Sequence, residues 1–289
     1  LVHAYGWESI FFVNLPVGIA GVILSILIIP AEEKHKNTWN AMVFKAKEAA
    51  LGIGQIMNLE RELHDLAKEG YVSQDKVKEA LILGWEEAVL HFLEDGNLDA
   101  QEEDKLVAYA NYFGFTQDEL DGKGIYTRFV QGAVLREILE GKVPQRFKTV
   151  EPLPFNFQKS ESLVWAFSNV KYYEKRTRRE YVGGSHGVSI RIAKGVYYRV
   201  GQLKGYPIER EEQVYVDTGI LAVTTKHLYF YGKIKSFRVP YSKIVSFTPY
   251  SDGIGIQRDA ASAKPQTFVT GDGWFIYNLV VNLAREQVN

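Results

Sequence analysis

The chain has 289 residues, of which 46% are hydrophobic and 24% charged. This composition is typical of roughly two folded domains and excludes a disordered chain. There is no cysteine, so disulfides and thiolate metal sites are also excluded. The net charge of −1 conceals an asymmetry, because residues 31–150 hold 15 Lys and Arg against 22 Asp and Glu, whereas residues 151–289 hold 19 against 12. Two such halves attract each other, present a basic surface to an anionic partner, or simply differ in origin.

An uncharged apolar run of 21 residues covers residues 10–30. About 20 apolar residues cross the hydrocarbon core of a bilayer as a helix, so we predict a transmembrane segment within residues 1–36. A signal peptide fits less well, because the basic start and the small-residue cleavage site are missing. Lys34 and Lys36 follow the run and favour a cytoplasmic position for the rest of the chain, at the inner (cytoplasmic) membrane.

The start of this run carries a motif whose matching residues are Trp7, Ile10, Phe11, Asn14, Pro16, Gly18 and Ile19. They resemble the W-x-x-I-F-x-x-N-x-P-x-G-I stretch of drug/proton antiporters of the major facilitator superfamily, although Glu8 replaces the usual basic residue. The resemblance covers residues 1–35 and implies one transmembrane segment. A transporter of that family needs about a dozen, and one helix cannot enclose a polar path. The alternative to a native membrane anchor is therefore a fragment or fusion of a transporter gene, which the start at Leu1 also suggests.

Residues 37–145 have apolar positions at helical spacing, which predicts a bundle of several short antiparallel helices. Helix starts are marked by one N-cap candidate and two capping boxes, namely Ser73, Asp99 with Glu102, and Thr116 with Glu119. Gly141 and Pro144 give a stop signal for the last helix.

The turn at Asp95 and Gly96 has two possible interpretations. With Gly96 at position six of an EF-hand loop, positions one and three fall on His91 and Leu93, which cannot supply the oxygen ligands of calcium. We therefore predict a tight turn before a capped helix, and no metal site. The D-G-x-L-x-x-x-E pattern that ends at Glu102 also resembles the helix junctions of TerB-like bundles in tellurite-resistance proteins, which implies a helical bundle over residues 70–140.

Residues 146–185 begin with a linker marked by Pro152 and Pro154, and residues 158–182 favour a helix with a basic end. The cations of this end are Lys171, Lys175, Arg176, Arg178 and Arg179. Basic runs with interspersed aromatics bind anionic lipid in some proteins and are solvated faces in most. We expect anionic lipid rather than nucleic acid as a partner.

A G-x-S-x-G motif at residues 183–187 has to be weighed as a catalytic nucleophile. That motif needs a strand before the serine and a helix after it. Alternating Val188, Ile190 and Ile192 predict a strand after Ser185 instead. We therefore predict no catalytic residue and no cofactor, and a chain that is not an enzyme.

Residues 186–289 change to an alternating pattern of short strands and end in one helix after Gly273. The G-x-L-x-x-T-x-x-x-L-x-F pattern of residues 219–230 and the V-P-x-x-x-I-x-S pattern of residues 239–246 resemble the core of GRAM-like and bacterial PH-like domains. This resemblance implies an antiparallel barrel or sandwich closed by a C-terminal helix. The predicted fold class is accordingly α+β, with an N-terminal transmembrane helix, a small helical bundle and a PH-like β domain.

The PH-like superfold serves lipid-binding, peptide-binding and scaffold roles, so it does not identify a ligand. If the domain binds an anionic headgroup, the contributing residues are those around the strand turns: Lys226, His227, Lys233, Lys235 and Arg238. Strand ends are also charged simply to block edge pairing. We expect a non-enzymatic, membrane-tethered adaptor that binds lipid or protein at the membrane face, with the transporter fragment or fusion as the alternative.

Overall fold

The structure is a computed structural model that describes residues 32–94, 96, 98–147, 152–182, 185–193, 196–203, 206–260 and 262–286, without the side chains of residues 178–210. The chain divides into two compact units, a helical unit, Leu1–Arg136, and a β unit, Glu137–Asn289.

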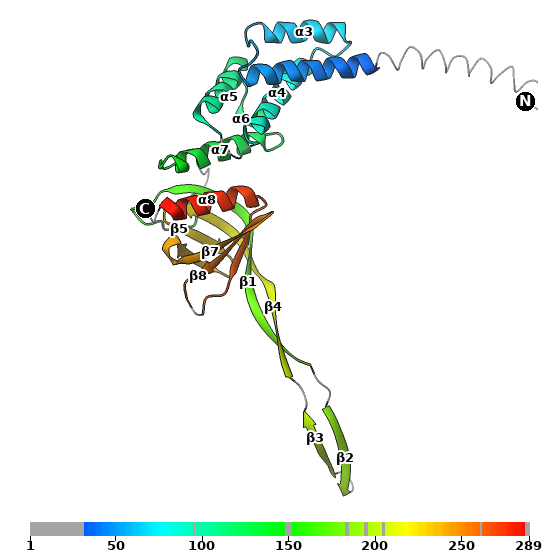
Figure 1. Cartoon of the computed structure of the whole chain (residues 1–289), viewed down its shortest axis with the longest axis vertical. Coiled ribbons are helices and arrows are strands. Elements are labelled where there is room, and N and C mark those ends of the chain that lie inside the picture. Colours follow the sequence, from blue (N-terminus) through cyan, green and yellow to red (C-terminus); the bar gives the residue numbers. More distant parts are fainter. Residues whose placement is uncertain are drawn as a thin grey trace, which may run out of the picture. The chain divides into compact units, whose positions relative to one another are not determined.

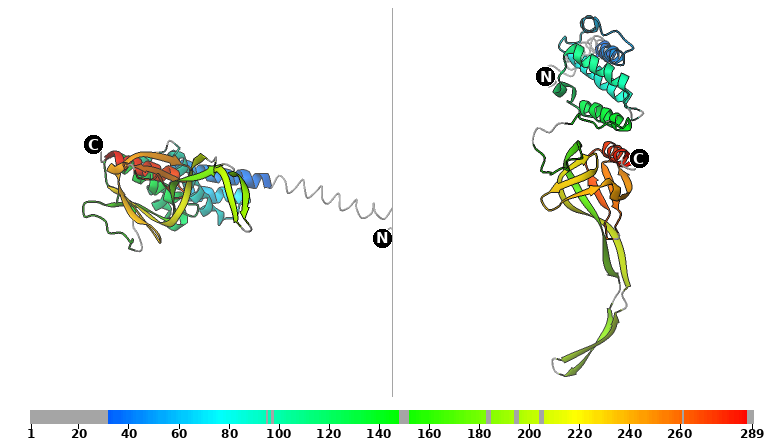
Figure 2. Two further views of the ribbon diagram at one scale, coloured as in Figure 1. Left: turned by 90° about the horizontal axis from the view of Figure 1, so that it is seen from below. Right: turned by 90° about the vertical axis from the view of Figure 1, so that its left-hand side faces the viewer.

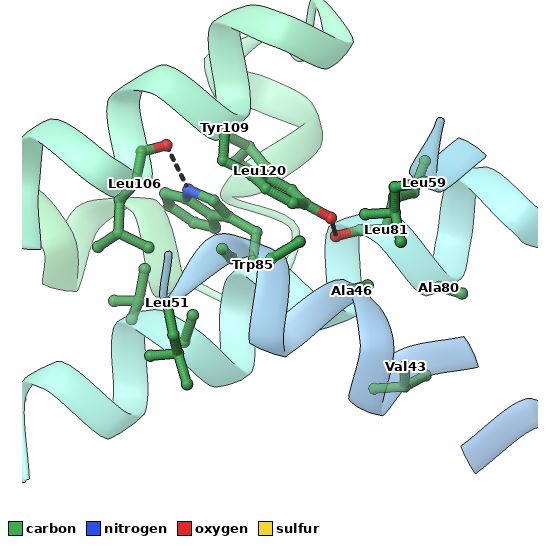
Figure 3. Packing of buried hydrophobic residues seen from close by; sticks show 14 of the residues in the cluster. Val43, Ala46, Leu51, Leu59, Ala80, Leu81, Trp85, Leu106, Tyr109 and Leu120 are labelled. Carbon is green, nitrogen blue, oxygen red and sulfur yellow. Dashed lines mark hydrogen bonds between the residues drawn. The ribbon is translucent and has the colours of Figure 1, made fainter. Parts of the chain in front are cut away.

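The helical unit begins, in its described part, with a helix over residues 32–50. Its further helices are α3 (Leu59–Glu69), α4 (Lys76–Phe92), α5 (Ala100–Phe113), α6 (Gln117–Leu120) and α7 (Ile125–Leu139), of which α7 crosses the division between the units. Figure 3 shows Trp85 and Tyr109 in the centre of the core, where the Trp85 indole donates to the Leu106 carbonyl and the Tyr109 hydroxyl to the Leu81 carbonyl, each at 3.1 Å. Both large rings are thus buried with their polar atoms satisfied.

Both predicted capping boxes are present, at Asp99 before α5 and at Thr116 before α6. The predicted N-cap Ser73 was wrong, because α4 starts later and has Asp75 as its N-cap. Ser73 instead donates its hydroxyl to the Asp75 carboxylate. A short polar side chain can bond its neighbour two residues on as readily as a helix end, so sequence alone does not distinguish the two.

The predicted fold class included a transmembrane helix and has to be corrected. None of the helices in the described part of the chain is long and apolar enough to cross a membrane. The longest, over residues 32–50, carries seven charged side chains. Residues 10–30, on which the prediction was based, lie outside the described residues. What the structure describes is an α+β chain with a helical unit and a curled antiparallel sheet.

The β unit is built on one seven-stranded antiparallel sheet with the order β6-β5-β4-β1-β9-β8-β7. Its strands are β1 (Leu163–Val182), β4 (Tyr206–Thr224), β5 (His227–Gly232), β6 (Ser236–Pro240), β7 (Ile244–Tyr250), β8 (Gly253–Arg258) and β9 (Gln266–Val269). The short helix η1 (Tyr241–Lys243) joins β6 to β7, and helix α8 (Gly273–Glu286) packs against η1, β7 and β8. Figures 1 and 2 show the sheet curled into a half-barrel, with β6 and β7 as open edges, where we predicted a PH-like barrel or sandwich.

Strand β1 replaces the basic helix that we predicted for residues 158–182. It pairs with β4 along its whole length, from Leu163 opposite Thr224 to Val182 opposite Tyr206. The error has a local cause: a register shift between Phe167 and Val170 places two buried side chains three residues apart, which imitates a helical period. The backbone hydrogen bonds to β4 and β9 then outweigh the weak local preference for a helix.

The strands predicted at the start of the β domain do not all join the main sheet. In the part of the chain that the structure describes, β2 (Ser185–Ala193) and β3 (Val196–Leu203) pair with each other as a separate two-stranded sheet. Figure 1 shows β1 and β4 running side by side beyond the curled sheet in the direction of this pair. The core of the main sheet is aromatic, with Tyr172, Phe230 and Phe268 in mutual contact.

Candidate functional site

The predicted cations of the β domain do not form one cluster. Lys226 and His227 lie where β5 begins, whereas Lys233 and Lys235 lie in the turn after β5 ends. Because β5 is six residues long, the two pairs are at opposite ends of one strand. Arg238 lies between them on β6, opposite Tyr229. These two ends have different chemistry.

At the start of β5, the predicted histidine His227 is hydrogen-bonded to the buried carboxylate of Glu161. The Glu161 side chain has no exposed surface, and it accepts hydrogen bonds from the Thr224 hydroxyl at 2.7 Å, from the Tyr229 hydroxyl and from His227 Nδ1 at 2.8 Å. Its fourth donor is the backbone N–H of Gln158 at 2.6 Å. We call Glu161, Thr224, His227 and Tyr229 the Glu161 clasp.

The clasp holds the segment before β1 against β5. Lys226 donates its ammonium to the Ser160 hydroxyl at 3.1 Å, and the rings of Phe155 and Phe157 pack against Tyr229. Burial raises the pKa of Glu161, but the four donated hydrogen bonds outweigh burial and hold the pKa at about 2. Lys226 and His227 each bond to the segment before β1, which gives them a structural role at this end of the sheet.

At the other end of β5, the turn of Lys233, Ile234 and Lys235 is fixed by a second carboxylate. Asp217 is buried, and it accepts hydrogen bonds from the backbone N–H groups of Ile234 at 2.7 Å and of Lys235 at 2.8 Å. It also accepts the N–H of Thr218. Burial raises the pKa of Asp217, and these backbone donors lower it below its ordinary value. The carboxylate therefore stays ionised and keeps the turn in one conformation.

The side chains of this turn are exposed to solvent. Ile234 is 71% exposed, and the lysines on either side of it are exposed as well. We call residues 233–235 the Lys-Ile-Lys turn. Burial of this apolar side chain against a partner would contribute favourable free energy. The two lysines were predicted from the sequence, whereas Ile234 and Asp217 were not, although the apolar residue between two cations in a hairpin turn is visible in the sequence.

The predicted cations of β1 are distributed over both faces of a strand, because successive side chains of a strand alternate. Lys171 is exposed, Lys175 is paired with Glu211, and Arg176 donates to Glu174 at 3.3 Å on the other face. The remaining two predicted cations are Arg178 and Arg179, whose Cα partners on β4 are Arg210 and Glu209 and whose side chains lie outside the described residues. The three described side chains therefore do not form the basic helix end that we predicted.

A hollow of about 450 Å³ lies over strands β7, β8 and β9 and was not predicted from the sequence. Its lining is mostly neutral and polar, and of the predicted cations it includes only Lys175. The signal in the sequence was the pair Gly253 and Gly255, two residues apart in a strand, which leaves one face of β8 without side chains before Gln257.

The G-x-S-x-G motif lies between two strands. Strand β1 ends at Val182 and β2 begins at Ser185, while Gly183 and Gly184 lie outside the described residues. The strand that we predicted after the serine is confirmed, and the helix that a nucleophile elbow needs is replaced by β2.

Comparison with known proteins gives one short match. Over 40 residues the chain is 50% identical to an uncharacterized MFS-type transporter of Mycobacterium tuberculosis. The match covers 14% of this chain and 7% of that protein, so the chain spans a small part of its relative. No protein-family model matches the chain. The predicted resemblance to major facilitator transporters is thereby confirmed for a short segment, and the PH-like, GRAM-like and TerB-like resemblances are not confirmed.

Proposed function

We propose that the chain is a non-enzymatic binding protein whose β unit attaches to an anionic membrane surface through the Lys-Ile-Lys turn. The observation that carries the proposal is Ile234, exposed between two exposed lysines on a backbone that Asp217 fixes. The short match to a membrane transporter supports a link to membranes. Attachment of this kind places a binding protein at the membrane face, as expected for an adaptor.

The chemistry of the turn suits the boundary between lipid headgroups and acyl chains. Burial of an isoleucine side chain contributes about 1.5–3 kcal/mol, and each lysine near an anionic surface about 1 kcal/mol. The sum of about 4 kcal/mol corresponds to a dissociation constant near the millimolar range. Such a contact is reversible, and it orients a protein that has a second membrane contact rather than anchoring it alone.

A site-specific fluorescence experiment tests the proposal. Because the chain has no cysteine, Ile234→Cys provides a single attachment point for a polarity-sensitive dye. With vesicles of phosphatidylcholine and phosphatidylglycerol, we expect the emission of the dye to shift to the blue, and with pure phosphatidylcholine vesicles to shift far less. The full chain is used, because the signal reports on position 234 whatever else contacts the bilayer.

The matched control is Ser242→Cys, an exposed position in η1. It lies beyond the end of β6 that pairs with the start of β5, so it is at the opposite end of these strands from the Lys-Ile-Lys turn. We expect no shift at position 242. An unchanged emission at position 234 with anionic vesicles would overturn the proposal, and so would equal shifts at both positions, since these indicate non-specific adsorption.

A further inference from the structure

The hollow over β8 is bounded by five strands of the curled sheet. Residues that line it and bear on its chemistry are Lys175, Gln213, Thr248, Tyr250, Gly255 and Thr267. Its volume of about 450 Å³ is within the range of about 300–1,000 Å³ that is usual for small-molecule sites. A pocket of this size with several convergent polar groups is a natural place to look for a ligand.

A glycine forms the floor of the hollow. Gly255 on β8 pairs with Thr248 on β7 and with Thr267 on β9. A Cβ atom at this position would lie 3.0 Å from the ring of Tyr250 and 3.2 Å from the Cβ of Thr248. A larger residue would therefore project into the hollow from its floor and press against the tyrosine.

A side-chain bridge spans the hollow. The Gln213 amide on β4 donates to the Tyr250 hydroxyl on β7 at 3.3 Å, although β1, β9 and β8 lie between these strands in the sheet. The same amide lies 3.5 Å from the Thr267 hydroxyl. Both distances are longer than the usual length of about 2.9–3.0 Å, so these weak bonds can be exchanged for bonds to a ligand at small cost.

The lining offers neutral hydrogen-bonding groups and almost no free charge. Lys175 is its only charged side chain, and Glu211 neutralises it. Among the described residues, no group hydrogen-bonds to the hydroxyls of Ser246 and Thr248, which leaves them available to a ligand. A phosphate or carboxylate ligand needs an uncompensated cation or several charge-assisted donors, which this lining lacks. Hydroxyl groups match it, because each both donates and accepts.

The ring of Tyr250 adds an apolar surface. Tyr250 is 39% exposed and lies over the glycine floor. An aromatic face with a polar tip suits a ligand that has C–H groups on one face and hydroxyls around its rim. We propose that the hollow binds one pyranose ring of a neutral sugar. This proposal goes beyond attachment to membranes, and neither depends on the other.

Saturation-transfer difference NMR on the full chain tests the proposal. Glucose, galactose, mannose and N-acetylglucosamine are the probes, each in large excess over the protein. We expect saturation transfer to the ring protons of at least one of them, and its affinity to fall about tenfold in Tyr250→Ala, since an aromatic contact contributes about 0.5–1.5 kcal/mol. Gly255→Val, which places a branched side chain on the floor of the hollow against Tyr250, should abolish the transfer.

Controls separate loss of the site from loss of the fold. Tyr231→Ala removes a tyrosine of similar exposure on β5 that does not line the hollow, and we expect it to bind as the parent chain does. Tyr250→Ala changes a half-exposed side chain, so the chain should stay folded by circular dichroism even if Gly255→Val does not. Absence of transfer to all four sugars would overturn the proposal. Undiminished transfer in folded Tyr250→Ala, or displacement of the sugar by inorganic phosphate, would also overturn it.

Discussion

Glu161 and His227 are 66 residues apart in the chain, and a hydrogen bond of 2.8 Å joins the carboxylate to Nδ1 of the imidazole. Glu161 belongs to the segment that enters the β unit, and His227 is the first residue of β5. The bond, together with those from Thr224 and Tyr229, holds the segment before β1 against the end of the sheet. The clasp is therefore a stability element of the β unit, and its contribution is measurable.

Replacement of the clasp carboxylate should destabilise the β unit. Glu161→Gln keeps the volume of the side chain but replaces one carboxylate oxygen with an NH2 group, which cannot accept a hydrogen bond. The buried hydroxyl and imidazole groups then lose their charge-assisted bonds. We expect the free energy of unfolding to fall by about 3 kcal/mol, measured by urea denaturation. The control is Glu211→Gln, which removes an exposed ion pair with Lys175 and should change the stability by less than about 1 kcal/mol. Equal effects of the two changes would contradict a special role of the clasp.

The clasp should also give the stability a defined acid dependence. The pKa of Glu161 is lowered from 4.5 to about 2 in the folded protein. A lowered folded-state pKa contributes stability that is complete above the unfolded pKa and is lost as the pH falls from about 4.5 toward about 2. We expect the difference in unfolding free energy between the parent chain and Glu161→Gln to shrink over this window and to be constant above about pH 5. Parallel curves down to about pH 3 would show that the carboxylate is not held in this way.

In the helical unit, α4 packs closely against the helix over residues 32–50, which allows a specific prediction. A Cβ atom on Gly84 of α4 would meet the Cβ of Ala46 and lie 2.7 Å from its backbone carbon. We expect Gly84→Ala to lower the free energy of unfolding by about 1–3 kcal/mol, although alanine has the higher helix propensity. Gly122→Ala is the matched control, because nothing lies within 4 Å of the added Cβ there. A stabilising Gly84→Ala would mean that the two helices are farther apart than the structure has them.

The proposed membrane contact predicts a dependence on charge. The double change Lys233→Gln and Lys235→Gln should weaken binding to phosphatidylglycerol vesicles by about 10- to 30-fold, at about 1 kcal/mol per lysine. Lys243→Gln, at an exposed position in η1 at the other end of the strands, should leave the affinity unchanged. Co-sedimentation with vesicles measures both. Added salt should reduce the difference between the double variant and the parent chain, because it screens exposed charges; a difference that is insensitive to salt would contradict the electrostatic part of the proposal.

The elements that the sequence predicted correctly depend on neighbours a few residues away. The capping boxes at Asp99 and Thr116 join residues three positions apart, and both formed as expected. The helix after Gly273 and the short strands from His227 to Val269 also follow local periodicity and turn residues. Strand β1 was missed, because the register shift before Val170 disguised its alternation, and its partner β4 lies tens of residues further along the chain.

For the candidate sites, the sequence identified types of residue but not their companions. Lys233 and Lys235 were expected to contribute, and the structure places them in one turn. His227 was also expected to contribute to anion binding, by the same argument, yet it is buried against Glu161. Whether a cation at a strand end is free or engaged depends on a carboxylate that can be far away in sequence, and periodicity carries no information about that distance.

By itself, the amino-acid sequence determined several local features of this protein: the two capping boxes, the short alternating strands after His227, and that no thiol chemistry is possible. Tertiary structure decided which groups meet. It paired β1 with β4, directed Asp217 to the Lys-Ile-Lys turn, and curled the sheet until Gln213 and Tyr250 touched across three strands. The physical reason is that caps and turns are satisfied within a few residues, whereas buried carboxylates and sheet curvature depend on the packing of the whole unit.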